Sequence, residues 1–144
     1  MGPEVHLLCG IMLSAISLVK THELHAAAGC IIGSVIPDID HIYEYKKYCD
    51  DFSVEPKIKE FSSGKYFDKK GTVYVFLHSW EIAVIGLAYV FLLRPGKCNN
   101  MVKGLVVGYT SHMILDQIGN NLSGWSYFWL YRWWHDWKQK SLLQ

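Results

Sequence analysis

Charged residues are scarce in this sequence. Asp, Glu, Lys and Arg make up 19% of its 144 residues, and the net charge is +1 with the seven histidines neutral. So small an excess offers no basic surface for nucleic acid, and we expect none as a partner. Hydrophobic residues make up 51% of the chain and the mean hydropathy is +0.10. This is apolar for a soluble domain but too polar for a chain lying mostly in a membrane, so single segments must decide the class.

Paired cysteines and a cleavable leader are also missing. The four cysteines are far apart and form no CxxC pair, which argues against a disulfide framework and a cysteine-ligated zinc site. The N-terminus has neither a basic segment nor a small-residue cleavage motif, so we expect no removable signal peptide. The length fits a single domain, residues 1–144, with one buried core.

Four apolar segments predict helices. They span residues 5–19, 24–36, 72–93 and 101–118. Pro37 ends the second, and Gly119 is a natural C-cap for the fourth. The sequence therefore predicts an all-α, antiparallel four-helix bundle associated with a membrane. Only the third segment comfortably reaches the roughly 20 apolar residues that cross a bilayer, so spanning and partial insertion both stay open.

The stretch 44–71 is polar, with seven lysines and six acids. It is long for a connection in a compact domain, and we expect a lid or a mobile loop.

The C-terminal stretch 124–144 is rich in aromatic residues. Trp125, Trp129, Trp133 and Trp137 recur every four residues. A helix with this stripe, followed by lysines, is typical of a membrane interface. The alternative, that the rings pack on the protein's own core, is equally open.

Histidine and aspartate residues recur near the ends of the apolar segments. In the run PDIDH, an extended backbone would turn Asp38 and Asp40 to the same side. His112 and Asp116 are four residues apart and therefore share one face of a helix. Taken singly, such pairs are more often structural than functional.

The predicted topology brings these residues together. If consecutive helices are antiparallel, the start of the first helix and the end of the second lie at one end of the bundle. The start of the third helix and the end of the fourth lie there too. The residues placed at the opposite end are Lys20, Arg94, Lys97 and Lys103.

Buried carboxylates and imidazoles are costly unless a cation neutralises them. Nitrogen and oxygen donors without thiolates suit zinc, with manganese or iron as alternatives, and one or two ions could be held. The expected ligands are His6, Asp38, Asp40, His41, His78, His112 and Asp116. We further expect catalytic roles for Asp40 and for Glu81, which follows His78 by three residues and would orient a ligand or act as a general base. A polar network without metal is the plainer alternative.

These motifs resemble a known family, the inner-membrane-associated metal-dependent hydrolases of the LexA-binding type. The resemblance rests on His6, the run PDIDH, His78-Ser79, and the run GYTSH (108–112) followed by Asp116. The family's common HRGxTHS run is absent, which removes a further ligand or an anion-binding arginine unless Glu81 replaces it. The order of ligands is also similar, more distantly, to zinc-dependent phospholipase C, which is all-helical.

The resemblance and the residues together predict a metal-dependent hydrolase at the inner membrane, acting on a phosphoester such as a phospholipid. The expected partners are membrane lipid and a lipid or small-molecule substrate. The alternative is a non-catalytic membrane protein whose metal serves structure, transport or partner recruitment.

Overall fold

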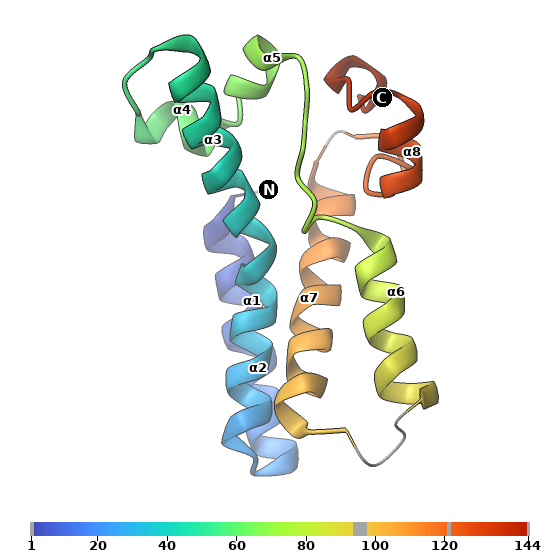
Figure 1. The fold of residues 1–144 in the computed structure, drawn as a ribbon. Helices are drawn as coiled ribbons and strands as arrows, with labels where there is room; N and C mark the ends of the chain where they lie inside the picture. The colour runs from blue at the N-terminus through green and yellow to red at the C-terminus, as the bar shows by residue number, and fades with distance from the viewer. Residues whose placement is uncertain (1, 94–97, 121, 144) are drawn as a thin grey trace.

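The computed structural model describes residues 2–93, 98–120 and 122–143, and the described chain is mostly helical, with two isolated β-bridges and no strand (Figure 1). The predicted all-α class is confirmed. Four helices form the body: α1 (Pro3–Thr21), α2 (Leu24–Val35), α6 (Trp80–Ala88) and α7 (Asn100–Gly119). In Figure 1, α1 and α6 run downward and α2 and α7 upward, so each helix is antiparallel to its neighbour in the chain.

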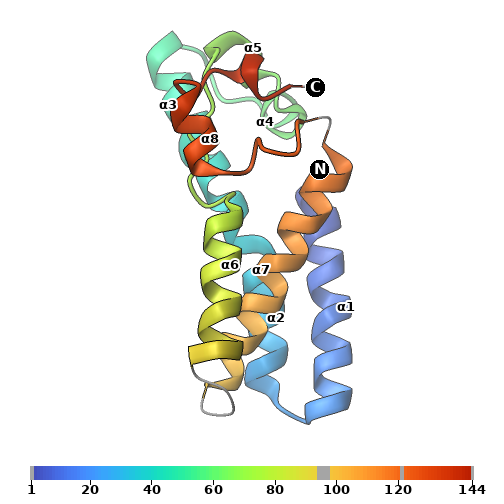
Figure 2. The same cartoon turned by 90° about the vertical axis from the view of Figure 1, so that its right-hand side faces the viewer.

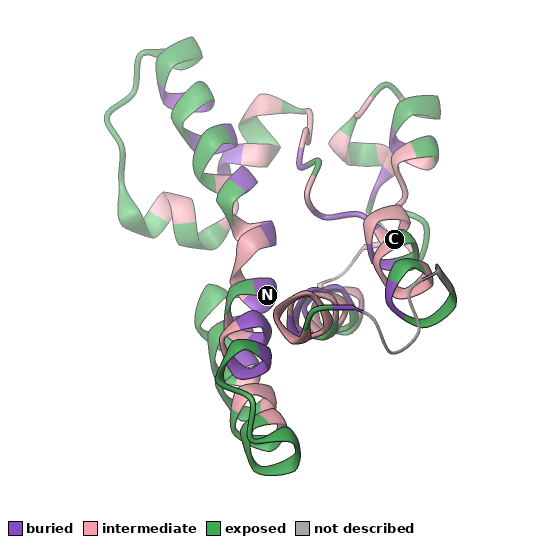
Figure 3. Cartoon of the chain, turned by 60° about the horizontal axis from the view of Figure 1, so that its bottom comes forward, coloured by how far each residue is buried: buried purple, intermediate pink, exposed green. Residues whose placement is uncertain are grey.

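Helix α1 exposes most of its length, as Figure 3 shows, and only His6 and Gly10 on it are buried. Its 19 residues span about 28 Å, close to the hydrocarbon thickness of a bilayer. It is the one helix in the described parts of the chain that is long and apolar enough to cross a membrane. From the sequence, only the segment 72–93 was expected to be long enough to cross a bilayer. Within 72–93 the structure has a shorter apolar helix, Trp80–Leu92. It consists of α6 and most of the π-helical turn η2 (Tyr89–Leu93).

Helices α2 and α7 touch backbone to backbone through glycines. A Cβ atom on Gly33 would lie 2.2 Å from the Leu105 carbonyl oxygen, and one on Gly104 would lie 2.1 Å from that of Ala26. Gly29 and Gly108 are similarly enclosed by backbone. Each helix thus contributes a GxxxG motif, the small-residue spacing with which helices approach closely in membranes.

Residues 44–71 are not the loop that was expected. They hold most of α3 (Ile39–Phe52), all of α4 (Ile58–Ser63) and α5 (Tyr66–Lys70), which lie beyond the bundle (Figure 2). Most charged side chains of this stretch are exposed, while Tyr45, Tyr48 and Tyr66 form a small core of their own. Lys70 also pairs with the buried carboxylate of Glu44.

Residues 72–79 were expected to be helical but precede the helix. Helix α6 begins only at Trp80, because the Ser79 side chain caps it by accepting a hydrogen bond from the Glu81 amide. The preceding stretch pairs with the C-terminal region through a bridge between Thr72 and Lys138.

The C-terminal stretch is not one aromatic helix. It contains the short α8 (Trp129–Trp134) and the turn η3 (Gln139–Ser141), and Asp136 and Trp137 between them have positive φ angles. The predicted stripe is therefore broken: Trp137 packs on Tyr74 and Phe76, whereas Trp125, Trp133 and Trp134 are exposed. Inside, the buried Arg132 donates hydrogen bonds to the Val75 and Ser126 carbonyls. Of the predicted far-end cations, Arg94 and Lys97 lie outside the described residues.

Candidate metal centre

The last two turns of α7 supply two polar side chains to the bundle interior. His112 is buried, and its Nε2 atom lies 3.4 Å from Asp116 Oδ2, as the four-residue spacing predicts. The other ring nitrogen, Nδ1, lies 2.8 Å from the carbonyl oxygen of Ser34 on α2. Because Nδ1–H donates to that carbonyl, the lone pair of Nε2 faces the interior.

His78 enters the same interior from the turn before α6. Its Nε2 atom lies 3.1 Å from His112 Nε2 and 3.4 Å from Asp116 Oδ2. Its Nδ1 atom lies 3.1 Å from Asp40 Oδ1, and the other Asp40 oxygen accepts a hydrogen bond from the Leu77 amide. In many metal sites a carboxylate binds one ring nitrogen of a histidine and so directs the other nitrogen at the metal. Asp40 is placed to do this for His78.

The three inward atoms form a triangle with sides of 3.1, 3.4 and 3.4 Å. Ligand atoms bound tetrahedrally at about 2.0–2.1 Å from one zinc ion are about 3.3–3.4 Å apart. The triangle therefore has the dimensions of one face of a zinc coordination tetrahedron.

Asp38 faces this triangle from the turn η1 (Ile36–Asp38). Its Oδ1 atom lies 3.7 Å from His78 Nε2 and 3.9 Å from His112 Nε2, in the position of a fourth ligand. The expected extended segment is absent: Asp38 ends η1 and Asp40 is in the first turn of α3. The two carboxylates consequently differ in position, with Asp38 near the Nε2 atoms and Asp40 behind the His78 ring.

The remaining predicted histidines flank the cluster. The His6 ring stacks on that of His112 with centroids 3.7 Å apart, and its Nε2 atom lies 3.1 Å from Asp116 Oδ1. His41 makes an edge contact with the His78 ring, and its Nδ1 atom lies 3.3 Å from the Tyr66 hydroxyl. The geometry thus brings six predicted ligands close enough to form overlapping triads: His6, Asp38, His41, His78, His112 and Asp116.

Glu81 is not part of this cluster in the structure. Its carboxylate accepts hydrogen bonds from the Ser79 hydroxyl at 2.6 Å and from the Leu130 amide at 3.5 Å. These contacts hold the start of α6 and join it to the C-terminal region. In this geometry Glu81 supports the start of α6, and its expected role as a general base stays a prediction.

Sequence reasoning missed the residues that hold the ligands in place. The Tyr109 hydroxyl bridges the His78 turn, lying 2.5 Å from the Leu77 carbonyl and 3.0 Å from that of Ser79. Asn120 donates to Asp116 Oδ1 at 3.0 Å. Tyr109 belongs to the GYTSH run, but its partner loop is 30 residues away in the chain, so only the fold reveals its contacts.

The electrostatics of the cluster favour positive charge at its centre. Burial alone would lower the pKa of His78, but its contacts with Asp38 and Asp40 outweigh burial and raise that pKa to about 9. Burial and the neighbouring His78 lower the pKa of His41 to about 4. Burial opposes ionisation of Asp38, but the surrounding imidazoles hold its pKa below the usual value. A divalent cation would be stabilised by the same carboxylates.

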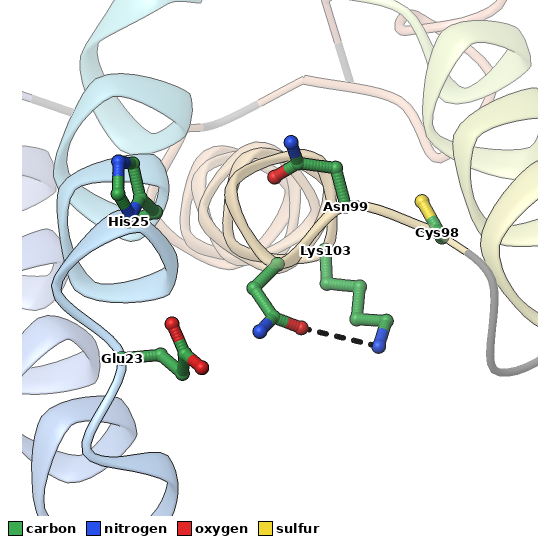
Figure 4. Close-up of a pocket in the computed structure, with 6 residues that line it drawn as sticks. Glu23, His25, Cys98, Asn99 and Lys103 are labelled. Carbon is green, nitrogen blue, oxygen red and sulfur yellow. Dashed lines mark hydrogen bonds between the residues drawn. The ribbon is translucent and has the colours of Figure 1, made fainter.

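A separate cavity of about 450 Å³ lies at the other end of the bundle, beside the start of α7 (Figure 4). Its lining includes Glu23, His25, Cys98 and Lys103, whose amine donates to Asn100 at 3.3 Å. It shares no residue with the cluster.

Residues 1–138 match a family model described as YdjM inner membrane protein. No curated protein and no solved structure matches the chain.

Proposed function

The chain belongs to the YdjM family of inner membrane proteins, and from this membership and its buried cluster we propose that it is a membrane-bound, metal-dependent hydrolase of phosphoesters. The observation that carries the proposal is the triangle of His78 Nε2, His112 Nε2 and Asp116 Oδ2, with its sides of 3.1–3.4 Å. Two imidazoles with a carboxylate form a common catalytic zinc ligand set, in which the ion would take the place of the proton on His78.

Each cluster residue has a proposed role. His78, His112 and Asp116 hold the ion, and Asp38 is the fourth donor. Asp40 orients His78 and strengthens its basicity, as outer carboxylates do in other metal sites. Zinc held in this way would polarise a phosphoryl oxygen and make water a nucleophile near neutral pH.

The cluster is not uniformly buried. His6, His78 and His112 are buried, whereas Asp38 and His41 are half-buried. A substrate would therefore approach from the side of Asp38 and His41, where a replaceable carboxylate would leave a position on the ion for water. The non-catalytic alternative has support too, because Asp38 could complete a closed, four-ligand structural site.

The depth of the site favours a lipid substrate. His6 lies in the first turns of α1, the helix with the length of a membrane span. One end of that helix is near the membrane surface if it crosses the bilayer, and the cluster is then level with lipid headgroups. Phosphodiesters are abundant there. The helices α3–α5 and α8 lie beyond the four-helix body, at the end where α1 begins (Figure 2).

We expect the detergent-purified, zinc-loaded protein to hydrolyse a phospholipid in mixed micelles faster than a water-soluble phosphodiester. A chelator should abolish both activities and zinc should restore them. His112→Ala is the inactive control, and His25→Ala at the far end of the bundle is the matched substitution that leaves activity intact. Stoichiometric zinc without hydrolysis of any ester would favour the non-catalytic alternative.

The exposed tryptophans of α8 give a separate test of the lipid contact. Trp133 and Trp134 are 66% and 79% exposed, and we expect both rings to lie among headgroups. In vesicles of lipids brominated near the glycerol end of the acyl chain, Trp133→Phe with Trp134→Phe should lower the quenched fraction of fluorescence. Trp137→Phe, whose ring packs on Tyr74 and Phe76, should leave that fraction nearly unchanged. Equal quenching in the double variant and the wild type would mean that these rings face water.

A further inference from the structure

We propose that the cluster holds two divalent cations side by side, bridged by the carboxylate of Asp116. This rests on the proposed metal centre and extends it, because one ion does not account for all the donors. His6 is the donor that the first ion leaves unused, and it indicates where the second ion binds.

An imidazole nitrogen has one lone pair and binds one ion. The Nδ1 atoms of His78 and His112 are directed to Asp40 and to the Ser34 carbonyl, so each ring offers only its Nε2 atom. Both Nε2 atoms belong to the first ion, since they are 3.1 Å apart. His6 must therefore bind elsewhere if it is a ligand.

The position of His6 defines where the second ion lies. Its Nε2 atom approaches Oδ1 of Asp116 at 3.1 Å, whereas His78 and His112 approach Oδ2. The rings of His6 and His112 are stacked 3.7 Å apart with an angle of 20° between their planes. Two nearly parallel imidazoles on the two oxygens of one carboxylate place two ions about 3.5–4 Å apart, the spacing of known two-metal sites.

Buried atoms without partners support this second position. His6 is 1% exposed, and among the described residues its Nδ1 atom has no hydrogen bond, while its Nε2 atom contacts the Asp116 carboxylate. Asp38 Oδ2 is buried and also lacks a hydrogen-bond partner among them. Unsatisfied buried polar atoms are rare in native proteins and call for an explanation such as a bound ion. His6, Asp38 and His112 offer ligand atoms within 4.8 Å of one another, so Asp38 can reach toward the His6 side.

The charge of the cluster agrees with two ions. Asp38, Asp40 and Asp116 carry three negative charges when ionised, so one divalent ion leaves the site negative. A second ion makes it positive by one charge, which would attract a phosphodiester anion. A pair of ions can also stabilise both the attacking and the leaving oxygen of a displacement at phosphorus.

Metal analysis of the zinc-loaded, dialysed protein tests the inference. We expect two zinc ions per chain in the wild type, one in His6→Ala, and two in the matched control His25→Ala. A wild type with one ion, unchanged in His6→Ala, overturns the second ion but leaves the metal centre standing. A wild type with no ion overturns the proposed function itself.

Manganese provides a readout that does not depend on the variant's folding. Two adjacent manganese ions bridged by a carboxylate are magnetically coupled, so the loaded wild type should give a multiline electron paramagnetic resonance spectrum. An uncoupled six-line spectrum at saturating occupancy of the intact protein would contradict the bridged pair.

Discussion

Replacing Asp116 with alanine is expected to remove bound metal from the protein. The two oxygens of this carboxylate approach three different histidines at 3.1–3.4 Å, so no other side chain in the cluster serves as many proposed bonds. Substituting residues that merely orient a ligand weakens metal binding by about 10- to 100-fold. The loss of a shared ligand should therefore exceed about 100-fold. Zinc content after dialysis and competition with a chromophoric chelator would measure it.

The control for Asp116→Ala is Asp51→Ala. Asp51 is an exposed carboxylate in α3 outside the cluster, and its variant should retain full metal content. Asp116→Asn separates the effect of charge from that of size, because it keeps the size of the side chain while removing its charge. Full zinc occupancy in Asp116→Ala would refute the assignment of the centre.

Replacing Gly33 with alanine is expected to separate α2 from α7. The added methyl group would lie 2.2 Å from the Leu105 carbonyl oxygen and 2.9 Å from the Tyr109 amide nitrogen. Backbone atoms cannot rotate away as a side chain can, so the helices must move apart. Overpacking of this kind costs about 3 kcal/mol, which is large against the total stability of a domain. Thermal unfolding in detergent, followed by circular dichroism, should show a markedly lower midpoint.

The same substitution should weaken metal binding, since the contact between His112 and the Ser34 carbonyl joins the two helices that Gly33 holds together. Gly124→Ala is the control, because nothing lies within 4 Å of the added atom and its φ angle is not positive. If Gly33→Ala unfolds at the wild-type temperature, the close approach of the two backbones is wrong.

The bundle and most of the cluster were within reach of sequence reasoning. Helical periodicity places His112 with Asp116, and the order of the helices places His6 and His78 at their end. Such inferences succeed because helix geometry is local and short connections restrict topology. The bound metal, the lipid partner and the hydrolytic activity stay predictions.

The predictions from sequence were wrong where tertiary contacts, and not the local amino-acid composition, decide the structure. Residues 44–71 are polar overall, but Tyr45, Tyr48 and Cys49 follow a helical spacing that indicates an amphipathic α3. Residues 72–77 are apolar enough for a helix, yet the Ser79 cap starts that helix later. The burial of Arg132, a charged residue in an aromatic tail, depends in part on the Val75 carbonyl, 57 residues earlier in the chain, so no local pattern predicts it.

Three residues from distant parts of the chain form hydrogen bonds with the backbone around His78. Asp40 holds the Leu77 amide, Tyr109 holds the carbonyls on both sides of His78, and Arg132 holds Val75. Two of these three residues are synthesised after His78. During translation the histidine therefore emerges before the groups that fix it, and the binding geometry is complete only once α8 has docked. The proposed metal site would therefore be complete only after the C-terminal region has folded against the His78 turn.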